Sequence, residues 1–221
     1  MSSGTVTRAG TVVHADEVVR YTFAERVGHW INGAAYSYLL ASGLALFTPY
    51  MYWLAAVLGG GGTIRFWHPW VGLVYMATIL WMHDKWRGDM KAIPEDKTWE
   101  KNIRAYVENR DDLMPPQERF NAGQKQFWWV MLWSSFILLI TGLMMWFPET
   151  ISARAHWLMP IVVFIHSAVA LITIAAFIIH VYMSLWMTPG SMKAMIDGKV
   201  STRWARAHHR LWFERITGRR T

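Results

Sequence analysis

The stretch IVVFIHSAVALITIAAFIIHVYMSLWM, residues 161–187, is apolar apart from two histidines, His166 and His180. It carries no Asp, Glu, Lys or Arg, and it is longer than the roughly 20 residues with which a helix crosses about 30 Å of hydrocarbon. A histidine inside such a helix is costly unless it has a partner, so each is a candidate for function. The stretch therefore predicts a membrane helix that holds sites at two positions.

Three further segments of the chain are free of charged side chains. They lie between Arg26 and Arg65, between Arg65 and Asp84, and between Lys125 and Glu149. Together with the first stretch they predict four transmembrane helices, at residues 30–52, 67–82, 127–147 and 160–187. Many tryptophans fall near the ends of these spans, where an amphipathic ring suits the headgroup region. The expected fold is an all-α membrane protein, a four-transmembrane-helix bundle in which residues 1–221 form one domain.

Lysine and arginine are distributed unevenly over the segments outside the spans. The N-terminal segment has three, the loop between the second and third spans has nine and the C-terminal tail has eight, whereas the other two connections have one each. Basic residues gather on the cytoplasmic side of membrane proteins. Both termini, the loop 87–126 and the tail 188–221 are therefore predicted to be cytoplasmic, and the net charge of +7 reflects topology rather than nucleic-acid binding.

Composition excludes several other classes. The chain has no Cys, so it has no disulfide, no thiolate-bound iron–sulfur cluster and no haem attached through C-x-x-C-H. The first 25 residues are polar and lack the apolar core of a signal peptide, so we expect no cleavage. The tail mixes aromatic and basic residues, an amphipathic pattern that predicts contact with the inner membrane surface or with a partner. A solvated basic tail is the alternative.

The two histidines of the first stretch are 14 residues apart. In a helix this spacing is about 21 Å along the axis and returns to within about 40° of the same face. Two ligands from one helix to a single ion would instead lie three or four residues apart. His166 and His180 are thus expected to point inward at two depths, as two stacked cofactors require.

Each of these histidines needs a second ligand at its own depth from another helix. In the predicted topology, His29 begins the first helix on the inner side, at the depth of His180. His68 begins the second helix on the outer side, at the depth of His166. His83, at the inner end of the second helix, competes for the inner site, although its charged neighbours indicate an interfacial position.

Ligation of two haem groups, each by two imidazoles, explains why all four residues are histidine, because neutral imidazole nitrogen binds iron on both faces of a porphyrin. Without Cys the haem must be type b. Small residues could let the flat macrocycle approach the helices, with ordinary close packing as the alternative; they are Gly43, Gly72, Gly142, Ala168 and Ala170. A zinc or copper transporter and a non-haem membrane anchor are the other classes considered, but no carboxylate lies within the spans to support a cation path.

Six motifs carry a resemblance to a known family. They are RVGHW at 26–30, FWHPWVG at 66–72, RFNAGQK at 119–125, FIHSAVA at 164–170, IIHVYMSLW at 178–186 and GKVSTRWARAHH at 198–209. Together they resemble the gamma, cytochrome b556 subunit of membrane-bound respiratory formate dehydrogenase of the Escherichia coli type, over residues 26–212. Each motif alone is weak, since related hydrogenase and thiosulfate-reductase cytochromes b share the plan of four histidines.

This resemblance implies a dihaem cytochrome b in the bacterial inner membrane. In the family, a catalytic alpha subunit oxidises formate at molybdenum or tungsten, and an iron–sulfur beta subunit with its own membrane anchor passes electrons on. They enter the outer haem, here His68 and His166, and cross to the inner haem, here His29 and His180. They then reduce menaquinone or ubiquinone, with proton uptake from the cytoplasm. The chain would be the quinone-reducing subunit of an oxidoreductase complex, without a catalytic residue for formate; a higher oligomer of the complex is left open.

The resemblance also implies a quinone site at Asn121, Gly123 and His180. We add Gln124, because its side-chain amide can likewise bond a quinone carbonyl; a helix-entry turn is the alternative role for this segment. Ala170 stands where the family is expected to have glycine, so haem contact there differs. The nearest alternative function is the cytochrome b of a membrane hydrogenase or thiosulfate reductase, with the same haems and another partner.

Overall fold

The computed structural model describes residues 9–14, 16–108, 110–151 and 153–218. Arg8, Arg219 and Arg220, which entered the topology prediction, lie outside this part. The chain divides into two compact units. Unit 1 comprises Met1–Val27, Asp84–Trp128 and Ile179–Thr221, and unit 2 comprises Gly28–His83 and Trp129–Ile178.

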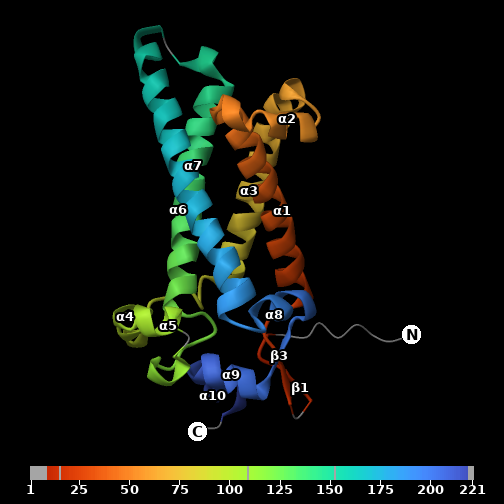
Figure 1. Ribbon diagram of the computed structural model, residues 1–221, viewed down its shortest axis with the longest axis vertical. Coiled ribbons are helices and arrows are strands. Elements are labelled where there is room, and N and C mark those ends of the chain that lie inside the picture. Colours follow the sequence, from red (N-terminus) through yellow and green to blue (C-terminus); the bar gives the residue numbers. More distant parts are fainter. Residues whose placement is uncertain (1–8, 15, 109, 152, 219–221) are drawn as a thin grey trace, which may run out of the picture. The chain divides into compact units, whose positions relative to one another are not determined.

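Segments of four long helices make up most of unit 2. These helices are α1 (Phe23–Phe47), α3 (Gly61–Trp86), α6 (Ala122–Trp146) and α7 (Met159–Tyr182). Within unit 2 they lie side by side, and α1 and α6 run opposite to α3 and α7 (Figure 1). Short elements lie in the connections: η1 (Pro49–Met51), α2 (Trp53–Val57), η3 (Pro148–Thr150) and η4 (Ala153–Leu158). Such short connections favour antiparallel neighbours.

Two helices in the described part of the chain are long and apolar enough to cross a membrane, Ala122–Trp146 and Ala155–Met187. The helices α1 and α3 are as long, but their Trp, Tyr and Gly residues lower the mean hydropathy. The structure is thus mostly helical, with two apolar candidates for membrane spans. The number and bounds of the four spans, the sidedness of the termini and the single-domain organisation stay predictions.

A capping box sets the start of α1 earlier than the predicted span, which begins at residue 30. The Thr22 backbone N–H donates to Glu25 Oε2 at 2.7 Å, and the Glu25 backbone N–H donates to Thr22 Oγ1 at 3.3 Å. This reciprocal pair satisfies two backbone donors that a helix start leaves free. The helix ends at Phe47, shortly before Pro49, whose ring cannot continue it.

The last long helix ends in a wider turn. Helix α7 stops at Tyr182 and is followed by the π-helical turn η5 (Met183–Met187), in which the Thr188 N–H donates to the Met183 carbonyl at 3.0 Å. Such turns are rare and are frequent at functional sites. Here the π-helical turn comes directly after His180 and before Thr188.

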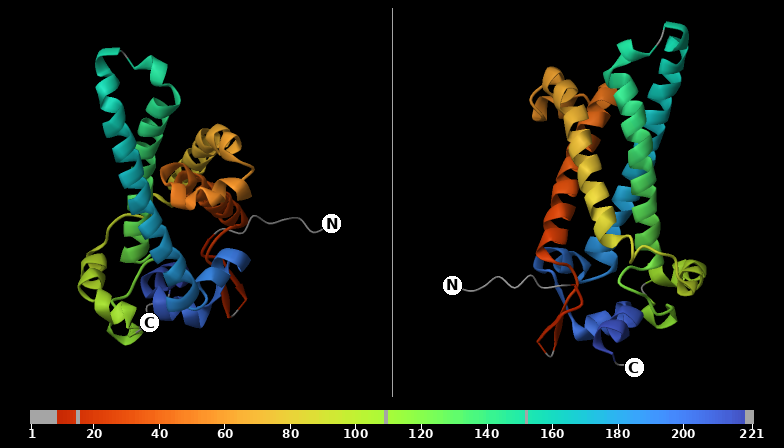
Figure 2. Two further views of the ribbon diagram at one scale, coloured as in Figure 1. Left: turned by 45° about the horizontal axis from the view of Figure 1, so that its top comes forward. Right: turned by 180° about the vertical axis from the view of Figure 1, so that it is seen from behind.

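Unit 1 combines a small sheet with short helices. The antiparallel sheet has the order β1 (Val12–His14), β2 (Glu17–Val19), β3 (Lys199–Ser201). The helical elements are α4 (Pro94–Lys101), α5 (Ile103–Val107), η2 (Asp111–Leu113), α8 (Ser191–Asp197), α9 (Thr202–His208) and α10 (Arg210–Thr217). In both views of Figure 2 the sheet lies beside α8 and α9. The tail 188–221 therefore adds a strand and three helices to unit 1.

Two aromatic residues of the tail, Trp212 and Phe213, are buried in unit 1, and contact of the tail with the membrane surface or a partner stays a prediction. Each is 2% exposed, because α10 turns these side chains into the core of unit 1. The Trp212 N–H also donates to the Gln117 carbonyl at 3.3 Å. Basic residues of α9 and α10 are left on the surface, among them Arg206 and Arg210.

A buried charge cluster holds unit 1 together around Arg119, which is 4% exposed. Its guanidinium donates to Glu25 Oε1 at 2.8 Å, to Asp89 Oδ2 at 2.9 Å and to the Arg20 carbonyl at 2.6 Å. Burial alone would lower the pKa of Arg119, but the nearby Glu25 and Asp89 carboxylates raise it above its ordinary value. Burial would likewise raise the pKa of Glu25, but Arg119 and hydrogen bonds from Thr22 and Trp86 bring it below its ordinary value.

Candidate functional site

Unit 2 contains a cavity of about 670 Å³ into which two of the four candidate ligands point. His68 of α3 and His166 of α7 both line it, and their ring centroids are 6.5 Å apart. The lining is largely apolar and comes from all four long helices. Arg65 is the charged side chain among the lining residues of this described unit. The volume is in the range of small-molecule and cofactor sites, about 300–1,000 Å³.

Glycines on the neighbouring helices make room for both rings. A Cβ atom at Gly43 would lie 3.5 Å from His68 Cε1, and one at Gly142 would lie 3.4 Å from His166 Cε1. Gly72 and Ala170 also line the cavity, as the sequence predicts for small residues beside a cofactor, whereas Ala168 is not among the lining residues.

The other two candidate ligands lie in different units. His29 belongs to unit 2, where its ring meets Trp30 edge-on at 5.3 Å between centroids. His180 belongs to unit 1, where its ring stacks on Phe127 at 4.3 Å and 6°. Their predicted pairing stays a prediction. His83, the competitor, packs edge-on against Trp129 within unit 2 at 5.8 Å.

Three of the four predicted quinone residues, Asn121, Gly123 and Gln124, lie at the start of α6, where Asn121 and Gln124 form a capping box. The fourth, His180, belongs to α7. Asn121 Oδ1 accepts from the Gln124 backbone N–H at 2.9 Å, and Gln124 Oε1 accepts from the Asn121 backbone N–H at 3.1 Å. The side chain of Asn121 is thus the helix cap, as the helix-entry alternative holds. Its Nδ2 also donates to the Tyr106 hydroxyl at 3.3 Å. A Cβ atom at Gly123 would lie 2.8 Å from Trp99 Cη2, so glycine here permits close packing.

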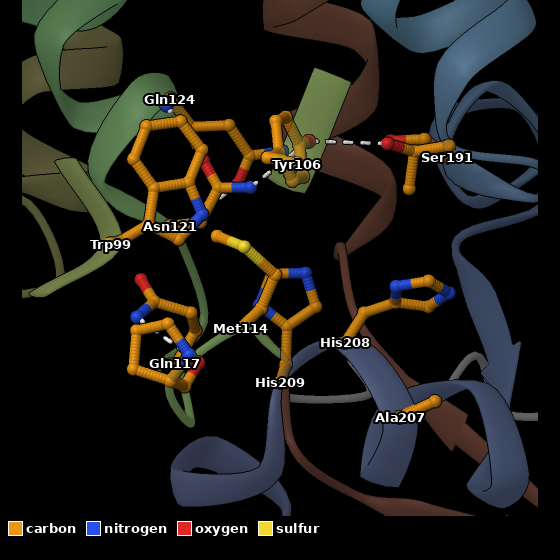
Figure 3. A pocket seen from close by; sticks show the side chains of 12 residues that line it. Trp99, Tyr106, Met114, Gln117, Asn121, Gln124, Ser191, Ala207, His208 and His209 are labelled. Carbon is orange, nitrogen blue, oxygen red and sulfur yellow. Dashed lines mark hydrogen bonds between the residues drawn. The ribbon is translucent and has the colours of Figure 1, made fainter. Parts of the chain in front are cut away.

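Asn121 and Gln124 also line a second, much smaller pocket, which lies in unit 1 (Figure 3). Its volume is about 30 Å³, which suits a water molecule rather than a quinone ring. His208, His209 and Thr188 contribute to its wall, and Thr188 Oγ1 lies 3.2 Å from the Tyr106 hydroxyl. Gly123 and His180 are not among the lining residues of this pocket.

His209 is a buried histidine whose position the sequence analysis missed. It is 2% exposed, and its Nδ1–H donates to the Glu118 carbonyl at 2.6 Å. Burial, with the charges of Arg20 and His208, holds the pKa of His209 well below its ordinary value of 6.5, although the carbonyl of Glu118 acts in the opposite direction. Only the dense packing of α9 and α10 in unit 1 distinguishes it from its half-buried neighbour His208.

Acid is expected to destabilise unit 1 through His209. Because the pKa of His209 is lower in the folded chain, the unfolded chain binds a proton below pH 6.5 that the folded chain does not. The free energy of unfolding therefore keeps its full value above pH 6.5 and decreases as the pH falls below it. Through His209, the free energy of unfolding decreases by at most about 1.4 kcal/mol per pH unit. A His209→Gln variant should therefore show a flatter fall in the unfolding midpoint below pH 6.5 than the parent, whereas His156→Gln, at an exposed histidine, should keep the parent slope. Parallel curves for the parent and His209→Gln would contradict this.

Among the described residues, no group of three or more His, Cys, Asp or Glu side chains could hold a metal ion. Unit 2 does bring two imidazoles together in one largely apolar cavity.

The family of the chain follows from comparison with known proteins. The model of the family described as prokaryotic cytochrome b561 matches residues 20–198. The chain belongs to this cytochrome b561 family. Among the relatives, the cytochrome b556(fdo) subunit of formate dehydrogenase from Escherichia coli strain K12 is 31% identical over 201 residues, which cover 91% of this chain and 94% of the relative.

Two further relatives carry names of the same kind. The cytochrome b556(Fdn) subunit of the nitrate-inducible formate dehydrogenase of Escherichia coli K12 is 31% identical over 199 residues, 90% of this chain and 91% of the relative. The formate dehydrogenase cytochrome b556 subunit of Haemophilus influenzae is 28% identical over 204 residues, 89% of this chain and 82% of the relative. The resemblance stated from the motifs is thereby confirmed.

Membership of a cytochrome b family implies b-type haem, and the cavity of unit 2 fits such a group. Its two imidazoles come from different helices, as bis-histidine ligation requires. Centroids 6.5 Å apart leave room for one ion bound to a nitrogen of each ring at about 2 Å. Each ring also has a hydroxyl at Nδ1, Ser42 Oγ at 2.7 Å from His68 and Thr141 Oγ1 at 2.8 Å from His166.

Proposed function

We propose that this chain is the dihaem cytochrome b subunit of a formate dehydrogenase, an electron-transfer and quinone-reducing subunit of the bacterial inner membrane. The observation that carries the proposal is the pair His68 and His166. Both line the cavity of unit 2, with ring centroids 6.5 Å apart, in a chain whose relatives are formate dehydrogenase cytochrome b556 subunits. The bundle would have four transmembrane helices and both termini in the cytoplasm, in line with the distribution of Lys and Arg.

The axial ligands we assign are His68 and His166 for the outer haem b, and His29 and His180 for the inner haem b. Bound haem b supplies reversible one-electron transfer, and two imidazole ligands leave iron no open position for oxygen. The largely apolar lining of the cavity suits the face of a porphyrin, and Arg65 offers a guanidinium to the carboxylates that a haem carries. The glycines 43 and 142 keep both ligand rings close to their neighbouring helices.

The partners of this subunit would be those that the resemblance implies. An iron–sulfur beta subunit with a membrane anchor would deliver electrons on the outer side, and a catalytic alpha subunit with molybdenum or tungsten would oxidise formate. The relatives are named as subunits of formate dehydrogenases, which supports an assembly of this type. Formate oxidation itself needs no residue of this chain.

We assign the quinone site to Asn121, Gly123, Gln124 and His180, all of unit 1. The pocket of about 30 Å³ at Asn121 is too small for a quinone ring, so binding would require this pocket to widen. The Nδ2 group of Asn121 has two hydrogens, and one is given to the Tyr106 hydroxyl. The other can donate to a quinone carbonyl while Oδ1 continues to cap α6. Menaquinone or ubiquinone would be reduced here, with protons drawn from the cytoplasm.

Two substitutions at Asn121 separate quinone binding from helix capping. Ser keeps an oxygen that can cap α6 but removes the amide donor, whereas Ala removes both. We expect Asn121→Ser and Asn121→Ala to lose most quinone reduction with haem content unchanged, and only Asn121→Ala to lose stability, by about 1 kcal/mol. Quinol formation, haem content and unfolding midpoint are measured on the same preparations. Full quinone turnover in Asn121→Ser would leave helix capping as the role of this residue.

The proposed function itself is tested on the purified parent protein. A reduced-minus-oxidised visible spectrum with pyridine haemochrome quantitation should give two b haems per chain, and a formate-oxidising partner should copurify. A folded preparation without haem would return the chain to the membrane-anchor class. Copurified hydrogen-uptake activity with nickel would assign it to a hydrogenase.

A further inference from the structure

We propose that Ser42 and Thr141 are positioning residues for the outer haem, each holding one iron ligand in the tautomer that presents Nε2 to the cavity. The inference rests on the proposed function, because it takes His68 and His166 as ligands. Neither residue follows from the motifs of the sequence, and neither would touch iron. Their role is argued from hydrogen bonds within unit 2.

The direction of the first hydrogen bond follows from a second acceptor. Ser42 Oγ lies 2.7 Å from the Tyr38 carbonyl and 2.7 Å from His68 Nδ1. A carbonyl can only accept, so the single hydroxyl hydrogen of Ser42 is given to Tyr38. The oxygen must then accept from His68, which places the ring proton on Nδ1. Ser42 is 0% exposed, so water does not compete for this bond.

Thr141 repeats the arrangement on another helix. Its Oγ1 donates to the Ile137 carbonyl at 2.7 Å and lies 2.8 Å from His166 Nδ1. By the same argument His166 carries its proton on Nδ1. Both ligands therefore keep the Nε2 lone pair, which is the form of imidazole that binds a metal ion.

The two positions share a local sequence device, a hydroxyl residue followed directly by glycine. Ser42 precedes Gly43, and Thr141 precedes Gly142. In each pair the hydroxyl binds Nδ1 of a histidine from the next helix, while the absent side chain of the glycine leaves room for Cε1 of the same ring. Each hydroxyl and the glycine that follows it thus fix three properties of one histidine ligand: which ring nitrogen carries the proton, how the ring is rotated and how deep it lies.

Loss of the hydroxyl has two physical consequences. The Nδ1–H group would be left without its acceptor in an apolar cavity, which favours ring rotation or the wrong tautomer. An acceptor at Nδ1 also makes the imidazole a stronger donor, which favours the ferric state. Its removal should therefore weaken haem retention and raise the reduction potential of the outer haem.

The test uses the full chain in its complex, with Ser42→Ala and Thr141→Val as the removing variants. Ser42→Thr and Thr141→Ser keep the hydroxyl. Ser37→Ala is the matched control, because Ser37 Oγ donates to the Gly33 carbonyl of the same helix at 2.8 Å but lies away from the cavity lining. Haem content is measured by pyridine haemochrome, and the midpoint potentials by redox titration of the visible spectrum.

We expect each removing variant to shift the ferric–ferrous equilibrium of one haem by about tenfold, which is about 59 mV for one electron. Where that haem is lost instead, its affinity should have dropped by about tenfold. The other haem, the conservative variants and Ser37→Ala should keep the parent values. Parent occupancy and parent potentials in both removing variants would overturn the positioning role. A parent protein without haem would instead overturn the proposed function, so the two failures are distinct.

Discussion

Replacing His166 with Ala is expected to abolish one of the two proposed haem groups and to leave the other in place. His166 and His68 line one cavity with their ring centroids 6.5 Å apart, so in the proposed site removal of either ring would leave the iron with a single axial ligand. The proposed inner site would take its ligands from His29 and His180 and should keep its haem. Pyridine haemochrome quantitation and a low-temperature difference spectrum of the purified variant measure the loss.

The pairing has a sharper consequence in the double variant. Residues that act as a unit are strongly non-additive, so His68→Ala combined with His166→Ala should remove no more haem than either change alone, and the same spectral component should disappear in all three. His156→Ala, at an exposed histidine of η4, is the control and should bind haem fully. Full occupancy in His166→Ala, or additive loss in the double variant, would refute the assignment.

Replacing Arg119 with Ala should give the largest loss of stability outside the haem site. The change leaves the Glu25 carboxylate, 7% exposed, without its cation, and removes the donor to the Arg20 carbonyl as well. Breaking a buried pair by deleting one partner costs about 3–5 kcal/mol. The unfolding midpoint of the variant, followed in detergent by near-UV circular dichroism, should fall by at least about 6 °C.

Arg104 offers a matched control for this prediction. Its guanidinium also meets a carboxylate at 2.8 Å, that of Glu108, but its side chain is 90% exposed. An exposed i,i+4 pair is worth only about 0.3–0.5 kcal/mol, so Arg104→Ala should leave the midpoint almost unchanged. Equal effects of the two variants would mean that the cluster around Arg119 stabilises no more than a surface pair. Glu25→Gln together with Arg119→Met should be milder than Arg119→Ala, since no unpaired charge is then buried.

The neighbourhood of His68 and His166 could be predicted because it depends on a few strong signals. The charge-free segments predict where the helices lie, and the distribution of Lys and Arg predicts their directions across the membrane. Together these two signals predict that His68 and His166 lie at the same depth. The structure brings these two rings to one cavity as that reasoning predicts. Of the small residues named from the sequence, Gly43, Gly72, Gly142 and Ala170 line this cavity and Ala168 does not; their contact with haem stays a prediction.

The remainder depends on contacts that have no periodicity in the sequence. The sheet pairs three-residue strands from opposite ends of the chain, for example Val18 with Val200, and runs so short show no alternation. The sequence of the tail has an amphipathic pattern, but Trp212 is buried in unit 1. The surface against which it packs is built from segments that are distant in the sequence. Asn121 could be placed at a helix start, but its bond to Tyr106 required α5 to be in position.

The π-helical turn at residues 183–187 marks a place where homologues can gain or lose a residue without rotating His166 and His180 relative to each other. Helix α7 is α-helical throughout residues 159–182, so one residue gained or lost between His166 and His180 would rotate the two by about 100° relative to each other. A deletion within Met183–Met187 would instead convert the wider turn to an ordinary one. The phase between the histidines would be kept, and the cost would fall on the contact between Thr188 and Tyr106. Insertions and deletions among homologues should therefore be found after His180 and be absent between His166 and His180.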